Sequence, residues 1–301
     1  MYTPDISEFP SFSLERLLTT CFGSVDEELK ACILIDLPDL ELMHDLAFLN
    51  ESSFQVQKYA KKYFLDPLLD GVANEVGYSC VDFLAFKTTG GSNLDPEDAV
   101  TDAKGAVLSF KQDVCPKYDI ILAITDYSLT APLTAMAKVH NFRGATLHGV
   151  NDIILGSGLA VDYTQISQQA EVFRNTLDKT DSFELSFQVE DSSYTLNIVC
   201  NGQTAQKSHG LCPPGKPDIA NLPAGEVYFV PESASGSFPF RYSDGTLAEM
   251  VVVDGAIKKA ILINGDQTLV DDRNLQLSED PATGIIGELG FGTQLLPFSG
   301  K

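Results

Sequence analysis

Two uninterrupted runs of apolar residues in the first half of the chain constrain its fold more than any other feature. The segments "ACILIDL" (31–37) and "YDIILAIT" (118–125) have the length of strands and show no regular polar alternation, which is typical of strands covered on both faces. "RGATLHGV" (143–150) predicts a third such strand. Strands of this kind occur in parallel sheets with helices on each side, so we expect an α/β domain.

Helical patterns lie between and after these strands. Segment 52–77 predicts a helix interrupted near Pro67, and segment 128–142 predicts another helix. Segment 162–180 has apolar residues at helical spacing on one face. Because strand, helix and strand follow one another with short connections, we predict a parallel sheet with helices in an α/β domain over residues 1–180.

The pattern changes from about residue 181. Apolar residues alternate with polar ones in "DSFELSFQVE" (181–190) and again in "YTLNIVC" (194–200), as in strands with one buried face. We therefore predict a mostly antiparallel β (α+β) domain over residues 181–301. Segment 201–220, rich in Gly and Pro, is expected to be its long loop.

Composition and charge exclude several classes of partner. Twenty Lys and Arg against 42 Asp and Glu leave a formal net charge of −22, which disfavours nucleic acid and anionic lipid as partners. No apolar stretch approaches the roughly 18 to 20 residues of a membrane span, and the N-terminus lacks the pattern of a signal peptide. We expect a cytoplasmic protein whose six cysteines, with no CxxC motif, are free and mostly buried thiols.

Most polar motifs have an ordinary structural explanation. Gly90-Gly91-Ser92-Asn93 lacks the Lys of a phosphate loop, and Ser128 and Thr130 fit helix capping as well as ligand binding at the carboxyl end of a strand. The four histidines are scattered along the chain and select no catalytic arrangement. We therefore assign no catalytic residue.

Two glutamates remain, each at the edge of an apolar, strand-like segment and each among glycines. Glu226 lies in "NLPAGEVYFVP" (221–231), and Glu288 lies in "GIIGELGFG" (284–292). Glycine lets a ligand or another backbone approach closely. The glutamates are either exposed carboxylates at strand ends or a pair that faces a common ligand.

The sequence segments around these glutamates resemble segments of the aminopeptidase T family of metallo-aminopeptidases. "PDIANLPAGEVYFVPESASGSFPF" resembles the family segment in which a glutamate before a strand binds a metal, and "GIIGELGFGTQ" is similar to the segment whose glutamate bridges two metals. "RGATLHGVNDIILGSGLAVDYTQI" is similar to the passage that ends the family's α/β domain, so the resemblance covers roughly residues 120–294. It implies that Glu226 is the first metal ligand and Glu288 the bridging carboxylate of a site for two divalent ions (Zn, Co or Mn).

The sequence departs from the family after the second glutamate. The family completes its site with a later block of His, Tyr, His and Asp, whereas this sequence has 13 residues after Glu288 and no histidine beyond His209. Catalytic zinc usually takes three protein ligands, and two carboxylates alone are hard donors that hold Mg²⁺ or Ca²⁺ weakly. We therefore expect a shortened, catalytically incomplete relative without a metal cofactor, which binds a peptide or peptide-like ligand at Glu226 and Glu288 as an accessory or substrate-presenting protein.

An enzymatic alternative stays open. In it the chain is a metal-dependent aminopeptidase whose remaining ligands come from a partner or from residues missing from this sequence. The resemblance also implies a homodimer, and an accessory role implies a partner enzyme. A purely structural subunit is the third hypothesis.

Overall fold

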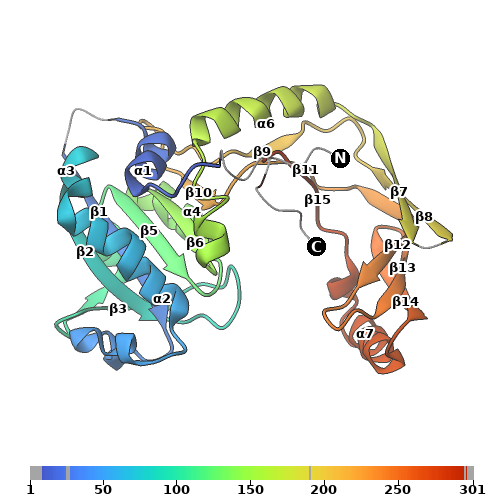
Figure 1. Cartoon of the computed structure of the whole chain (residues 1–301), viewed down its shortest axis with the longest axis horizontal. Coiled ribbons are helices and arrows are strands. Elements are labelled where there is room, and N and C mark those ends of the chain that lie inside the picture. Colours follow the sequence, from blue (N-terminus) through green and yellow to red (C-terminus); the bar gives the residue numbers. More distant parts are fainter. Residues whose placement is uncertain (1–8, 25–27, 190, 295, 297–301) are drawn as a thin grey trace. The chain divides into compact units, whose positions relative to one another are not determined.

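The computed structural model describes residues 9–24, 28–189, 191–294 and 296. The chain forms two compact units, and each is assembled from segments that are not contiguous (Figure 1). The first contains the described residues within Met1–Ala170, Ser208–Gly225 and Thr293–Lys301, and the second contains those within Glu171–Lys207 and Glu226–Gly292. An α/β unit and a unit of mostly antiparallel strands confirm the predicted fold class.

The first unit is built on a largely parallel sheet. Its parallel strands have the spatial order β10-β6-β5-β1-β2, and β3 and β4 continue the sheet beyond β2 in antiparallel pairing. In chain order the parallel strands therefore lie as 2-1-3-4-5, a doubly wound arrangement. The strands are β1 (Leu29–Leu37), β2 (Tyr78–Lys87), β3 (Ala99–Asp102), β4 (Val107–Ser109), β5 (Ile120–Thr125), β6 (Arg143–His148) and β10 (Ile219–Leu222).

Helices cover both faces of this sheet, which explains the continuous apolar runs. Ile33 and Ile35 of β1 pack in one core with α1 and α2, whereas Cys32 and Leu34 pack in a second core with α4 and η5. All residues of β1 from Ala31 to Leu37 are therefore buried. The helical segments of this unit are α1 (Leu14–Phe22), η2 (Leu40–Asn50), α2 (Gln55–Ala60), η3 (Lys61–Leu65), η4 (Leu68–Val72), α3 (Ala73–Glu75), η5 (Phe110–Val114), α4 (Thr130–His140) and α5 (Asp152–Leu155).

The prediction of one long loop over residues 201–220 was wrong. This region contains β9 (Gln206–Ser208) and the start of β10, which pairs in parallel with β6 in the register Ile219↔Gly144 to Leu222↔Leu147. A Cβ atom added to Gly144 would collide with the carbonyl oxygen of Ile121 and would lie 3.0 Å from Ile219 Cδ1. A glycine is therefore required where β6 is enclosed by its two neighbours.

The second unit contains an antiparallel sheet with the order β14-β13-β12-β8-β7. Helix α7 covers one face through a core that includes Met250, Ala260 and Val270. The predicted alternation in residues 194–200 is confirmed, because every second residue of β8 from Tyr194 onward is buried. The elements are β7 (Ser182–Val189), β8 (Ser192–Val199), β12 (Ser233–Arg241), β13 (Leu247–Val253), β14 (Ala256–Asn264), α7 (Gln267–Glu279) and η6 (Pro281–Gly284).

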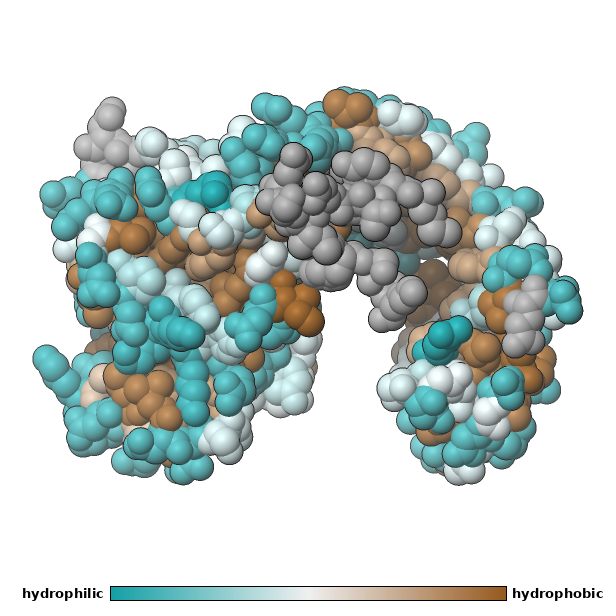
Figure 2. Space-filling view, in the orientation of Figure 1, coloured by the Kyte–Doolittle hydropathy of each residue, from teal (hydrophilic) through white to brown (hydrophobic). Residues whose placement is uncertain are grey.

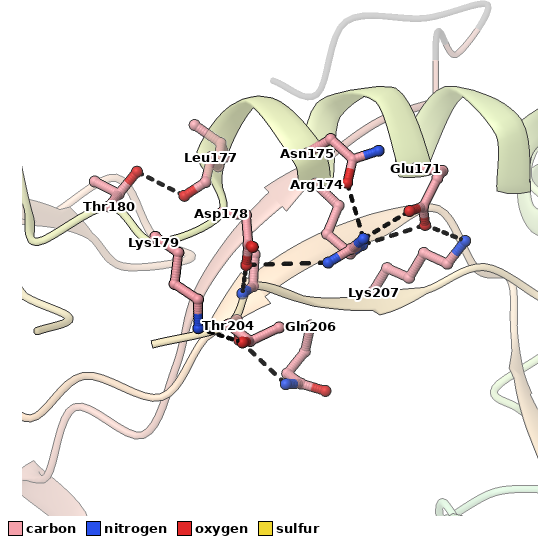
Figure 3. Close-up of polar contacts among 11 residues, drawn as sticks. Glu171, Arg174, Asn175, Leu177, Asp178, Lys179, Thr180, Thr204, Gln206 and Lys207 are labelled. Atoms are coloured by element: carbon pink, nitrogen blue, oxygen red, sulfur yellow. Dashed lines mark hydrogen bonds and ion pairs between the residues drawn. The ribbon is translucent and has the colours of Figure 1, made fainter. Parts of the chain in front are cut away.

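The helix predicted over residues 162–180 is α6 (Tyr163–Leu177), and ion pairs tie its last turns to the segment around β9 (Figure 3). Glu171 accepts from Arg174 at 2.6 Å and from Lys207 at 2.7 Å, and these partners lower the pKa of Glu171 to about 2. Lys179 Nζ donates to Thr204 Oγ1 at 2.7 Å. Ion pairs this exposed orient side chains but contribute little stability.

The molecular surface carries both hydrophilic and hydrophobic residues. Figure 2 shows hydrophilic residues over most of the visible surface, interrupted by small hydrophobic areas. Within the described residues, no helix has both the length and the apolar character needed to cross a membrane. All six cysteines are free thiols, and all except the partly exposed Cys80 are buried, as predicted.

Candidate functional site

Of the two predicted glutamates, Glu226 begins one strand of the second unit and Glu288 directly precedes the strand that pairs with it. β11 (Glu226–Phe229) and β15 (Leu289–Gly292) are antiparallel neighbours, and their register places Glu226 opposite Gly292 and Phe229 opposite Leu289. Because side chains alternate across a strand, each strand has one apolar and one polar face.

The apolar face anchors this strand pair. Val227 and Phe229 are fully buried. Phe183 packs against both strands, with its ring centroid 5.1 Å from that of Phe229 and 5.2 Å from that of Phe291. The ring of Phe291 also meets Phe173 of α6 edge-on at 5.9 Å. Aromatic packing on this side fixes which face of the pair remains open.

The open face brings Glu226 and Glu288 together, although they are 62 residues apart in the sequence. The register places Glu226, Tyr228 and Gly290 on this face, and Glu288 stands one residue before β15. A Cβ atom added to Gly290 would collide with Glu226 Oε1 and would lie 3.5 Å from Glu288 Oε1. Glycine at position 290 therefore leaves the space that the Glu226 carboxylate occupies.

The electrostatics of this face are those of a negative site. Burial, and secondarily the charge of Glu288, raises the pKa of Glu226 above its usual value. The pKa of Tyr228 is raised by burial and by the charges of both glutamates, so its hydroxyl stays protonated. Within the described ranges, neither glutamate forms an ion pair with Lys, Arg or His. The face therefore lacks a counter-charge from the described protein.

The donor atoms on this face do not fit a two-metal centre. They are two carboxylates and a phenol, without imidazole, whereas a catalytic zinc ion usually takes three protein ligands. In the part of the chain that the structure describes, no group of three or more His, Cys, Asp or Glu side chains could hold a metal ion. The chemistry that these residues themselves support is recognition of a cationic group.

The hydroxyl and glycine motifs of the first unit have a structural role. Asn93 Oδ1 accepts a hydrogen bond from Ala131 N at 3.0 Å, and Ser128 N donates to Ser92 Oγ at 3.3 Å. Thr130 Oγ1 lies 2.7 Å from Thr146 Oγ1. Asn93 thereby satisfies a main-chain donor in the first turn of α4, whereas the N-cap residue is Leu129, which makes no side-chain capping bond. The bonds of Ser128 and Thr130 named above connect the start of α4 to neighbouring segments.

A second polar group, which the sequence analysis missed, lies at the carboxyl ends of β1 and β5. Gln57 Nε2 donates to Asp36 Oδ1 and to Asp126 Oδ2, both at 3.0 Å. Asp36 is 1% exposed, and burial raises its pKa to about 6, with Asp126 adding to the shift. The available signal was that each aspartate ends an apolar run of a predicted parallel strand, where α/β sheets bind ligands.

Comparisons with known proteins assign no function to the glutamates of β11 and β15 or to the group of Asp36, Asp126 and Gln57. No protein-family model matches the chain, and a search of curated proteins finds no match. The resemblance to the aminopeptidase T family accordingly stays a prediction.

Proposed function

We propose that this chain is a catalytically incomplete relative of the aminopeptidase T family that binds the ammonium group of a peptide or peptide-like ligand at Glu226 and Glu288. One observation carries the proposal. The two segments in which the resemblance is most specific pair as β11 and β15 and place both carboxylates beside Gly290 without a basic partner among the described residues.

An ammonium group suits this face chemically. It offers three hydrogen-bond donors and one positive charge to two carboxylates that repel each other. Glu226 is half-buried, so a cation beside it is less screened by water than at an open surface. The absence of a side chain at Gly290 lets the Glu226 carboxylate lie against β15, close to Glu288. In this proposal the protein presents a peptide to a partner enzyme, and its free, mostly buried thiols favour a cytoplasmic location.

The test is selection from a hexapeptide library offered in two forms, one with free and one with acetylated N-termini. We expect equilibrium dialysis and mass spectrometry to show enrichment of free-amine members and no enrichment of acetylated ones. Glu226→Gln or Glu288→Gln, each of which removes one charge and keeps the shape, should weaken the best peptide about tenfold, the equivalent of one charge-assisted contact. Equal retention of both libraries, or unchanged affinity in both variants, would exclude the proposal.

A pair of glycine variants provides a matched control. Gly290→Ala places a methyl group where the Glu226 carboxylate lies, whereas a Cβ atom on Gly292 of the same strand meets nothing within 4 Å. Gly290→Ala should lower peptide affinity about tenfold and Gly292→Ala should leave it unchanged. Equal losses in the two variants would indicate a general disturbance of β15 and not a displaced carboxylate.

The enzymatic alternative is tested on the same protein. Metal content is measured after purification without chelator, and an aminoacyl-chromophore panel is assayed with added zinc, cobalt or manganese. Two tightly bound metals and released chromophore, both lost in Glu288→Gln, would replace the binding proposal with a two-metal aminopeptidase whose further ligands lie outside the described residues. The same samples, run by analytical ultracentrifugation, test the homodimer.

A further inference from the structure

One edge of the five-stranded antiparallel sheet in the second unit is a long strand with a single neighbour. β7 ends the order β14-β13-β12-β8-β7 and pairs with β8 in an unbroken register from Ser182↔Val199 to Val189↔Ser192. An edge strand leaves every second residue's main-chain N–H and C=O groups without a strand partner, and another strand can pair with these groups.

The hydrogen bonds of β8 show which residues of β7 direct their main chain outward. Val199, opposite Ser182, accepts through its carbonyl oxygen from Glu232 N at 2.9 Å, on the side away from β7. Because the direction alternates along a strand, Ser182, Glu184 and Ser186 direct their N–H and C=O groups away from β8. Among the described residues, no main-chain hydrogen bond joins these three residues to a loop or turn.

The other described sheet edges carry features that oppose pairing. β14 has two adjacent lysines, Lys258 and Lys259, and its register against β13 shifts at two places. The edge strands β4, β9, β10 and β15 have only three or four residues each. Short length, lysine and bulges are the usual protection of an edge. β7 has eight residues, contains neither Lys nor Pro and shows no register shift, so it lacks this protection.

The sequence of β7 is nearly palindromic about Leu185. In "SFELSFQ" (182–188), phenylalanines stand two residues before and after Leu185, and small or acidic polar residues stand directly beside it. Two copies that pair antiparallel around Leu185 therefore place Phe183 opposite Phe187 and Leu185 opposite Leu185. The same pairing places Glu184 opposite Ser186, so no like charges face each other.

The apolar side chains of β7 are placed to use this pairing. Phe183, Leu185 and Phe187 are only partly buried, and the polar residues between them are exposed. Residues directly opposite each other in antiparallel strands share a face, so the second copy would continue the apolar row of the first. A register shifted by one residue would instead set Phe183 against Gln188, and apolar residues would face polar ones along the whole strand.

We propose that the β7 edge is a self-association surface, at which a second copy of this chain pairs antiparallel across Leu185 and continues the five-stranded sheet. One pair of strands buries less area than a permanent dimer interface, so the dimer is weak, with a dissociation constant roughly in the micromolar range. Each copy carries a formal net charge of −22, so the copies repel and added salt strengthens the dimer. This surface does not depend on the peptide-binding proposal.

Sedimentation equilibrium and amide hydrogen exchange by NMR on the full chain, over a range of protein concentrations, test the surface. We expect a monomer–dimer equilibrium that sodium chloride shifts toward the dimer. The amides of Glu184 and Ser186 should become protected as the dimer forms, whereas those of Leu185 and Phe187, which face β8, should be protected at every concentration. A monomer at all concentrations, a dimer whose Glu184 and Ser186 amides exchange freely, or protection of these amides only when peptide is added would each overturn the proposal.

Variants of Ser186 test the register. Ser186→Glu sets two glutamates against each other at both symmetry-related positions and should weaken the dimer about tenfold, whereas Ser186→Lys sets a lysine against Glu184 and should strengthen it by a similar factor. Ser235 of the inner strand β12 is exposed on the same face, because it lies opposite Asn197, which lies opposite Glu184.

Ser235→Glu and Ser235→Lys are therefore matched controls and should leave the dissociation constant nearly unchanged. Equal effects of the same charge at positions 186 and 235 would reduce the result to net charge and overturn the pairing. None of these variants touches Glu226 or Glu288, so failure of the self-association proposal is distinguishable from failure of the peptide proposal.

Discussion

Replacing Asp36 with asparagine removes a buried ionisable group while keeping its shape. In the wild type, burial raises the pKa of Asp36 from 3.8 to about 6. Asparagine retains an oxygen for the hydrogen bonds that Oδ1 accepts from Asp126 N and Gln57 Nε2. The variant therefore isolates the effect of the charge on stability.

The direction of the effect follows from which state holds the proton more tightly. Below pH 3.8 the carboxyl group is protonated in both states, and the stability linked to this proton is fully present. Between pH 3.8 and about 6 the unfolded chain has lost the proton while the folded protein keeps it, so the free energy of unfolding falls as pH rises. A shift of about two pKa units corresponds to about 3 kcal/mol in total, of which about half is lost between pH 5 and pH 8.

The assay is urea unfolding of both proteins at pH 5 and pH 8, with a chelator present. We expect Asp36→Asn to be the more stable protein at pH 8, and its advantage over the wild type to grow by about 1.4 kcal/mol from pH 5 to pH 8. Asp70→Asn should show no such growth, because Asp70 is exposed. A wild type more stable than Asp36→Asn at pH 8, or equal pH dependence of the two, would refute the reasoning.

Two further predictions concern the peptide face and the sheet. The pKa of Glu226 is raised by burial and by the charge of Glu288, so peptide affinity should fall as the medium becomes acidic and Glu226 takes up a proton. Glu288→Gln should move the midpoint of that fall to lower pH. Calorimetry across pH measures the affinity, and an unmoved midpoint would show that the two carboxylates do not interact. Gly144→Ala should destabilise the first unit by about 2 to 4 kcal/mol in urea unfolding, because the new methyl group meets the Ile121 carbonyl and Ile219; a neutral result would mean that the β6 neighbours separate without cost.

The elements that the sequence predicted well are those whose pattern is local. Continuous apolar runs predicted β1, β5 and β6, and alternation of apolar and polar residues predicted β7 and β8. A strand buried on both faces needs apolar residues at every position, whereas a strand buried on one face needs them at every second position. β10 escaped prediction because it is four residues long, lies in a stretch rich in Gly and Pro, and exists only through pairing with β6, more than 70 residues earlier.

For the candidate sites too, the sequence indicated single residues but not which residues lie close together in the fold. The sequence indicated Glu226 and Glu288 as carboxylates at strand edges among glycines, and it contained Asp36 and Asp126 as the polar ends of two apolar runs. It did not reveal that β5 lies beside β1, so nothing connected the two aspartates with each other or with Gln57.

By itself, the sequence determined the local periods, the α/β character of the first unit, the antiparallel character of the second and the large negative charge. Only the tertiary structure decided which residues meet. Strand order brings Asp36 to Asp126, and the register of β11 against β15 puts Glu226 and Glu288 on one face. The physical reason is that side chains alternate with a period of two, so a slip of one residue in β15 would move its side chains to the opposite face, and local sequence alone does not specify that pairing.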